Sequence, residues 1–204
     1  WQIAPDNPQA APRLLSDRSS QDRYNDPGAP LMRRNAAGRS VLQFSDDGQA
    51  IFLLGAGASE AGDRPFVDRF ELASAKATRL YQSGGGEYVM PMALLDDQGG
   101  QLLISRETPD RPGNIFVREL ATGSERQLTD IAHPVPALAG VRKEQIRYAR
   151  ADGVQLTAVL LLPPGYDAKR AGSRPVLLWA APGEFKAAEA ASQVTGSPYR
   201  FNAP

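Results

Sequence analysis

The sequence of 204 residues contains no cysteine and one histidine, His133. Without cysteine the chain can form neither disulfides nor thiolate metal sites. The single histidine is also the one imidazole that these residues could offer as a catalytic base. The absence of cysteine suits an exported bacterial protein, although cytosolic proteins often lack cysteine too. We therefore expect a periplasmic or secreted bacterial location.

The chain also lacks an excess of charge of either sign and a long hydrophobic run. Its 23 basic residues are balanced by 23 acidic residues, so no field of one sign attracts nucleic acid or anionic lipid. The longest apolar stretch, residues 156–164, is far shorter than the roughly 20 residues of a membrane span. We expect neither nucleic acid nor a membrane as partner. No signal peptide is visible, and the chain begins at Trp1 without a methionine, so we expect a truncated segment of a longer protein.

Runs typical of strands recur along the first 130 residues, with turn residues between them. Two such pairs of runs are 40–44 with 50–54 and 92–97 with 101–105. The corners contain Gly48 and Gly99, and glycine supplies the positive φ that tight hairpins require. Acidic pairs at 46–47 and 96–97 occupy the same corners, where aspartate favours the turn. These aspartates therefore indicate turns, and we expect no metal site from them.

A repeat relates residues 65–82 to residues 114–130 with a shift of 48. The shift aligns Glu71-Leu72-Ala73 with Glu119-Leu120-Ala121, and Leu80 with Leu128. A repeat of roughly 40–50 residues with four strands is typical of a β-propeller blade. A weaker partial copy lies at 1–15. The alternative is an ordinary antiparallel sandwich with coincidental similarity.

The last third of the chain has a different pattern. Residues 131–144 contain two prolines and no periodicity, which predicts a linker. Residues 145–166 predict a hairpin with a type I′ turn at Asp152-Gly153. Residues 175–179 form a continuous apolar run of the kind that helices bury on both faces. Alanines at 187–191 favour a short helix.

Two stretches of this region resemble the prolyl oligopeptidase family of serine peptidases. They are KEQIRYARADGVQLTAVLLLPPGYD at 143–167 and RPVLLWAAPGEFKAAEAASQVTGSP at 174–198. Within the family, the glutamyl endopeptidase-like branch carries a similar W-A-x-P-x-E-F loop followed by A-x-Q-V-x-G-S. Residues 63–83 and 94–114 also resemble its late propeller blades. The resemblance covers most of the chain.

The resemblance implies a mostly β chain in which the last blades of a β-propeller precede the first strands of an α/β-hydrolase domain. The implied division is a partial propeller of two to three blades at 1–130, a linker at 131–144 and the truncated start of the peptidase domain at 145–204. The implied function is peptide hydrolysis by acyl transfer to serine, with selectivity for glutamate. The nucleophile elbow, acid and base of the family follow later and would lie beyond Pro204.

From the same resemblance we expect two partners, the peptide substrate and the remainder of the hydrolase domain. The chain alone is expected to be inactive. Its partial propeller would leave sheet edges open, and open edges invite pairing. We therefore expect marginal stability or association of the isolated chain.

One position departs from the family pattern. The loop after the apolar strand commonly supplies a tyrosine hydroxyl to the oxyanion hole, and the matching position here is Ala181. Alanine has no side-chain donor, and losing one such donor typically costs on the order of 10²–10³ in rate. The parent enzyme is weakened, the donor comes from elsewhere, or the alignment is off by one residue.

Two further sequence patterns suggest catalytic or phosphate-binding sites, but neither meets the requirements of such a site. Ser59 lies in the nearest approximation to a nucleophile elbow, but a turn and not a helix follows it. The glycine-rich stretches 55–62 and 83–87 lack the Lys-Ser/Thr of a phosphate-binding loop. We therefore expect no catalytic residue, no cofactor and no metal in this chain. The alternative function is a β-propeller binding module for peptide or carbohydrate without catalysis, although such a module has no use for residues 174–198.

Overall fold

The computed structural model describes residues 1–180 and 183–202 and is mostly β, as expected. The strands are β1 (Ala29–Pro30), β2 (Met32–Arg34), β3 (Ser40–Leu42), β4 (Ala50–Gly55), β5 (Phe66–Glu71), β6 (Lys76–Gln82), β7 (Tyr88–Leu94), β8 (Gln101–Thr108), β9 (Arg111–Glu119), β10 (Glu125–Gln127), β11 (Arg142–Ala149) and β12 (Gln155–Leu162). The helices are a 3-10 turn at Pro136–Leu138 and α1 (Ala188–Ala191). Within the described residues, no helix has the length and apolar character needed to cross a bilayer.

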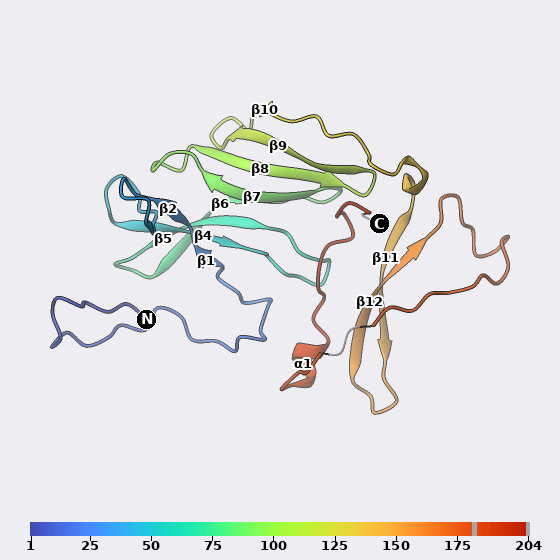
Figure 1. Ribbon diagram of the computed structural model, residues 1–204. Coiled ribbons are helices and arrows are strands. Elements are labelled where there is room, and N and C mark those ends of the chain that lie inside the picture. The colour runs from blue at the N-terminus through green and yellow to red at the C-terminus, as the bar shows by residue number, and fades with distance from the viewer. Residues whose placement is uncertain (181–182, 203–204) are drawn as a thin grey trace.

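Two four-stranded antiparallel sheets form the body of the molecule. The first has the order β1-β4-β5-β6 and the second the order β10-β9-β8-β7. The second sheet lies over the first, and the β11–β12 hairpin stands to one side of both (Figure 1). A small β2–β3 hairpin branches off between β1 and β4. The C-terminal segment runs back between the hairpin and the sheets (Figure 1).

The repeat seen in the sequence is a structural repeat of strand, turn and strand. A shift of 48 residues carries β5 onto β9 and β6 onto β10. In the first turn the N–H of Ala75 donates to the carbonyl of Glu71, and in the second the N–H of Gly123 donates to the carbonyl of Glu119. Ala75 and Gly123 both have positive φ, 54° and 72°. The same backbone turn is therefore built twice.

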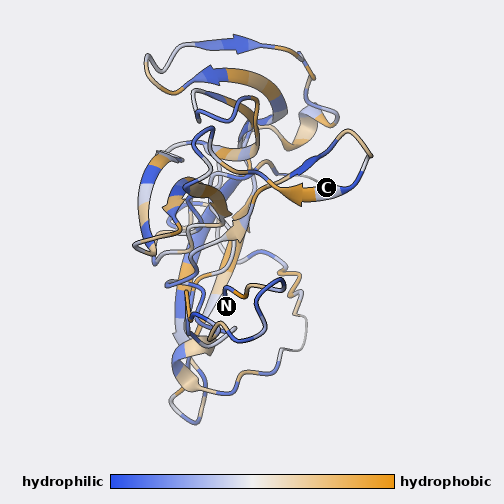
Figure 2. Cartoon of the chain, turned by 90° about the vertical axis from the view of Figure 1, so that its left-hand side faces the viewer, coloured by the Kyte–Doolittle hydropathy of each residue, from blue (hydrophilic) through white to orange (hydrophobic). Residues whose placement is uncertain are grey.

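The hydrophobic core joins the two sheets. Its buried members are Phe52, Val67, Val89, Leu94, Leu102 and Ile104. The first two side chains come from β4 and β5, and the other four come from β7 and β8. Hydrophobic and hydrophilic stretches are mixed along the strands (Figure 2). Burying one large apolar side chain stabilises a fold by about 1.5–3 kcal/mol, and this shared core holds the sheets together.

The corner between β7 and β8 has the predicted turn chemistry. The carboxylate of Asp96 accepts hydrogen bonds from the N–H groups of Gln98 and Gly100, both at 2.9 Å, and of Gln101 at 2.7 Å. Burial opposes ionisation, but these donors keep the pKa of Asp96 below its usual value of 3.8. The predicted hairpin at 92–105 is confirmed.

The other predicted corner is only partly correct. Residues 40–42 pair with β2 and not with β4. The run 40–44 reaches the run 50–54 through a single bridge between Phe44 and Ile51. A two-strand hairpin at this position is therefore wrong, because β4 is already flanked by β1 and β5.

The β11–β12 hairpin is confirmed, but its turn differs from the prediction. The N–H of Arg150 donates to the carbonyl of Val154, and the N–H of Gly153 donates to the carbonyl of Arg150, both at 2.9 Å. A type I′ turn needs positive φ at two residues, and Gly153 alone has it here, at 88°. The loop is a three-residue turn closed by a glycine bulge. The type I′ assignment is wrong, because Asp152 keeps a negative φ.

The predicted strand at 175–179 is not formed. The segment forms no strand pairing, and its four large apolar side chains are 80–91% exposed: Val176, Leu177, Leu178 and Trp179. A strand needs a neighbour to satisfy its backbone donors and acceptors, and within the described chain none lies beside this run. The predicted buried strand is wrong for this chain, whereas the short helix at 187–191 is confirmed as α1.

The two copies of the repeated turn predict opposite effects of substitution. A left-handed backbone costs a residue with a Cβ about 1–2 kcal/mol, and part of this is offset by the larger entropy of unfolded glycine. We expect Ala75→Gly to raise the free energy of unfolding by about 0.5–1 kcal/mol, and Gly123→Ala to lower it by about 1 kcal/mol. Urea unfolding followed by circular dichroism measures both. Ala77→Gly, inside β6, is the control and should destabilise the chain, and a loss of stability in Ala75→Gly would contradict the turn geometry.

Candidate functional site

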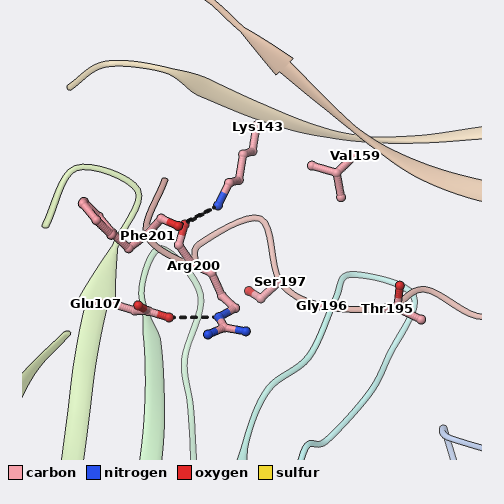
Figure 3. Close-up of a pocket in the computed structure, with 8 residues that line it drawn as sticks. All are labelled: Glu107, Lys143, Val159, Thr195, Gly196, Ser197, Arg200 and Phe201. Atoms are coloured by element: carbon pink, nitrogen blue, oxygen red, sulfur yellow. Dashed lines mark hydrogen bonds and ion pairs between the residues drawn. The ribbon is translucent and has the colours of Figure 1, made fainter. Parts of the chain in front are cut away.

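A cavity of about 330 Å³ lies where the second sheet, the β11–β12 hairpin and the C-terminal segment meet (Figure 3). It is lined by Glu107, Lys143, Val159, Thr195, Gly196, Ser197, Arg200 and Phe201. Glu107 lies at the end of β8, Lys143 on β11 and Val159 on β12. The cavity is within the range of sites that take small ligands, about 300–1,000 Å³. Its lining combines two cationic side chains, one carboxylate and two hydroxyls.

An ion pair with unequal exposure dominates the cavity. The Nε of Arg200 donates to Oε1 of Glu107 at 3.0 Å (Figure 3). The side chain of Glu107 is 16% exposed, whereas that of Arg200 is 58% exposed. The guanidinium also lies 5.1 Å from the centre of the Tyr88 ring, a distance at which a cation is attracted to an aromatic face. The pair therefore presents its positive member to solvent.

Lys143 ties the C-terminal segment to β11. Its ammonium donates to the carbonyl of Arg200 at 2.6 Å and to that of Phe201 at 3.2 Å. Burial lowers the pKa of Lys143 from its usual 10.5, and the charge of Glu107 opposes this change. Asn202 continues the attachment, because its side-chain amide donates to the carbonyl of Val141 at 2.7 Å.

Asp63 anchors the other side of the same segment to the loop after β4. Its carboxylate accepts from Arg23 at 3.1 Å and from the N–H of Gly196 at 3.2 Å, and its own N–H donates to the carbonyl of Gly196 at 2.7 Å. Burial raises the pKa of Asp63 above its usual 3.8, although Arg23 acts in the opposite direction. A Cβ at Gly62 would come within 2.9 Å of Pro198. The close approach of the two loops therefore requires glycine at position 62.

The N-terminal region also holds this segment. The N–H of Val194 donates to the hydroxyl of Tyr24 at 2.9 Å, and the N–H of Arg23 donates to Oε1 of Gln193 at 2.8 Å. Val194 is fully buried. Residues from three distant parts of the sequence thus fix the position of the cavity wall.

The structure does not bring Ser59 and His133 together. The hydroxyl of Ser59 donates to the carbonyl of Gly62 at 2.7 Å, within its own loop. The Nδ1 of His133 accepts from the N–H of Val135 at 3.0 Å, and the ring packs edge-on against Phe201 with centroids 4.8 Å apart. Each residue therefore bonds to its own local partner. Ala181, the expected oxyanion-hole position, lies outside the described residues.

The glycine-rich stretches are connecting loops. In the first, the N–H of Arg64 donates to the carbonyl of Gly57 at 2.9 Å, which closes the loop on itself. In the second, the hydroxyl oxygen of Ser83 accepts from the N–H of Val89 at 3.1 Å. In residues 1–180 and 183–202, no three side chains of His, Cys, Asp or Glu gather as metal ligands would.

Sequence reasoning missed the group formed by Glu107, Lys143 and Arg200. Nothing in the sequence distinguishes these three residues from the many other acidic and basic residues of the chain. The one available signal was position, because Arg200 closely follows the A-x-Q-V-x-G-S motif of the family resemblance. The ion pair joins residues 93 positions apart, and no local pattern reports such a contact.

Nearly the whole sequence is similar to parts of two plant proteins. The chain is 42% identical over 213 residues to a protein of Oryza sativa subsp. japonica named "Probable glutamyl endopeptidase, chloroplastic". It is 40% identical over 214 residues to the protein of the same name from Arabidopsis thaliana. Each alignment covers 98% of this chain, which spans 23% and 22% of the length of these relatives. No protein-family model matches the chain.

Two solved structures are similar to parts of the chain. The AtxE2 isopeptidase S527A variant with bound Astexin3-dC4 is 17% identical, with a TM-score of 0.39 over 71% of this chain and 23% of its own. Oligopeptidase B from Trypanosoma brucei with covalently bound antipain is 12% identical, with a TM-score of 0.41 over 59% of this chain and 18% of its own. Superpositions this loose do not establish a common fold.

The relatives correct one expectation from the sequence. A periplasmic or secreted bacterial location was inferred from the absence of cysteine. Both relatives are plant proteins whose names describe them as chloroplastic. The inferred location is wrong, because a chain without cysteine is compatible with many compartments.

Asp63 and Asp152 are expected to titrate on opposite sides of the ordinary aspartate pKa of 3.8. Burial raises the pKa of Asp63, whereas the hydrogen bond from Arg150 lowers the pKa of the exposed Asp152 to about 2. Carboxyl ¹³C NMR through a pH series measures both midpoints. A midpoint for Asp63 below 3.8 would contradict the burial that the structure gives this side chain.

The two titrations have opposite consequences for stability. Folded Asp63 holds its proton more tightly than the unfolded chain does, so its contribution is present below pH 3.8 and is lost as pH rises through the raised pKa. The contribution of Asp152 is present above pH 3.8 and is lost as pH falls through about 2. We expect Asp63→Asn to remove the first dependence and Asp152→Asn, its matched control, to remove the second. Denaturant unfolding at several pH values tests this difference in sign.

Proposed function

Because the chain is related over nearly its whole length to the glutamyl endopeptidase-like branch of the prolyl oligopeptidase family, we propose that it is part of a serine peptidase that cleaves peptides after glutamate. The observation that carries this proposal is the 42% identity over 98% of the chain. The family resemblance inferred from the sequence is confirmed by both relatives. The chain spans less than a quarter of their length, so the activity is proposed for the whole protein.

In this proposal, residues 1–130 are two to three blades of a β-propeller, residues 131–144 are a linker and residues 145–204 begin an α/β-hydrolase domain. Support comes from the two four-stranded antiparallel sheets, which are stacked in sequence order and related by the 48-residue repeat. Four antiparallel strands per repeat are what a propeller blade requires. The β11–β12 hairpin forms a separate sheet, as a new domain would.

The proposed partner of the apolar run at 176–179 is the remainder of the hydrolase sheet. Its four large apolar side chains are 80–91% exposed, and covering them would stabilise the assembly by about 1.5–3 kcal/mol for each side chain fully buried. A continuous apolar run of this kind is typical of a strand covered on both faces. In this proposal the run becomes an inner strand of the hydrolase sheet and pairs with a neighbouring strand on each side, as the family resemblance implies.

The nucleophile, acid and base are proposed to lie outside this chain. Acyl transfer by a serine triad needs a base within hydrogen-bond reach of the serine. The one histidine, His133, is bonded to Val135, and Ser59 is bonded within its own loop. Residues that follow the hydrolase strand in the longer protein would supply the reacting groups.

Activity assays on the chain and on the longer protein test this proposal. We expect purified 1–204 not to hydrolyse a glutamyl peptide, because it lacks the triad. The longer protein, with a Gly-x-Ser-x-Gly motif after an apolar strand, should cleave after glutamate and lose activity on labelling with a fluorophosphonate. Turnover by 1–204 that disappears in Ser59→Ala would refute the proposed location of the triad.

Ala181 allows a test of the oxyanion hole in the longer protein. We propose that the position lacks the hydroxyl that the family commonly uses, so Ala181→Tyr should raise kcat, by about 10²-fold if the new donor reaches the oxyanion. Ala181→Phe is the matched control, because it adds the ring without the donor. Equal kcat values for the two variants would contradict the proposal.

A further inference from the structure

We propose that Arg200 binds the acidic side chain of the peptide substrate, in the cavity that it shares with Lys143 and Ser197. The inference rests on the proposed function, which requires a site for a glutamate side chain, and assigns the group that forms it. Neither relative's name identifies such a residue. The ligand class is a carboxylate on a short aliphatic stem.

The guanidinium of Arg200 has donors available for a ligand. Its Nε is occupied by Glu107, and within the described chain its two terminal nitrogens form no hydrogen bond to protein. Guanidinium N–H groups match the two oxygens of a carboxylate, and such charge-assisted pairs are the strong class of hydrogen bond. Arg200 can therefore hold Glu107 and a second carboxylate at the same time.

The buried carboxylate does not cancel the site. The side chain of Glu107 is 16% exposed, whereas the side chain of Arg200 is 58% exposed. Lys143 adds a second positive charge at the wall, although two of its three donors are occupied by backbone carbonyls. The three charged side chains that line the cavity, two cationic and one anionic, sum to +1. An entering anion therefore meets more positive than negative charge among the side chains of the cavity lining.

The position of Arg200 is fixed before any ligand arrives. Glu107 holds its Nε, the ring of Tyr88 lies beneath its guanidinium, and Lys143 holds its carbonyl. A side chain already held in place loses less conformational freedom on binding. This arrangement favours binding of a carboxylate at the guanidinium.

Two other side chains complete the fit to glutamate. Ser197 is buried, and its hydroxyl oxygen accepts from the N–H of Tyr199 at 3.3 Å. The hydroxyl proton forms no hydrogen bond within the described residues and can be donated to a ligand oxygen. Val159 supplies an apolar wall against which the methylene stem of a glutamate can lie. The cavity also lies between the two parts of the chain that we assign to propeller and peptidase domain.

Binding measured on chain 1–204 by NMR tests this site. The probe is N-acetyl-glutamate α-amide, and its neutral isostere N-acetyl-glutamine α-amide is the comparison. We expect the glutamyl compound to bind about tenfold more tightly, a difference of about 1.4 kcal/mol, with shifts at Arg200 and Val159. Arg200→Gln should abolish this preference, and Arg150→Gln, at the tip of the β11–β12 hairpin, should leave it unchanged. Equal binding of the two compounds, or of inorganic phosphate and the glutamyl compound, would overturn the proposal.

Arg200→Lys covers the case in which Arg200→Gln disturbs folding. Lysine keeps the charge opposite Glu107 but cannot offer the paired donors, so affinity for the glutamyl compound should fall while the cooperative unfolding transition is retained. If Arg200→Lys bound the glutamyl compound with unchanged affinity, paired hydrogen bonds from the guanidinium to the carboxylate would not be needed, and the assignment would be overturned.

The Arg200→Gln variant, placed in the longer protein, separates this inference from the proposed function. If the longer protein cleaves after glutamate and Arg200→Gln keeps the kcat/KM of the parent, the site is refuted and the function stands. If 1–204 binds the glutamyl compound through Arg200 and the longer protein cleaves nothing, the function is refuted and the site stands. With both correct, Arg200→Gln raises KM for glutamyl peptides more than it lowers kcat.

Discussion

The cavity depends on the attachment of the C-terminal segment to the sheets, and the Asp63–Gly196 contact is its central constraint. Two hydrogen bonds join these residues in both directions, and Arg23 neutralises the half-buried carboxylate. A buried charge without such a partner would be costly. Because Gly196 is held in this way, the residues that follow it run along the end of β8 and bring Arg200 to Glu107. Anchoring one glycine thus positions a side chain four residues further along.

The two sheets are built from the same local sequence pattern, which occurs once in each repeat. Each repeat places alternating apolar residues on strands and closes its turn with a hydrogen bond back to the glutamate that ends the previous strand. Such signals lie within a few residues of one another, so they were readable in the sequence. The Asp96 corner, the 48-residue repeat, the β11–β12 hairpin and α1 were predicted correctly for this reason.

Other features depended on partners that the sequence does not identify. The turn at Asp152-Gly153 could be type I′ or a glycine bulge until the φ of Asp152 was known. The run at 175–179 has the composition of a buried strand, but composition does not supply the neighbour that pairs with it. Glu107 and Arg200 meet across 93 residues through the path of the segment after α1. The candidate site could therefore be located only after the chain was folded.

Charge balance over a whole chain says little about a single cavity. Equal numbers of acidic and basic residues remove the long-range field that would attract polyanions. A local site needs only that one member of an ion pair be buried while the other faces solvent. Glu107 and Arg200 have this asymmetry, and Lys143 adds a positive charge whose ammonium donates to two backbone carbonyls. Balanced charge is therefore compatible with the proposed carboxylate site, because short-range donors discriminate between carboxylate and amide where the long-range field cannot.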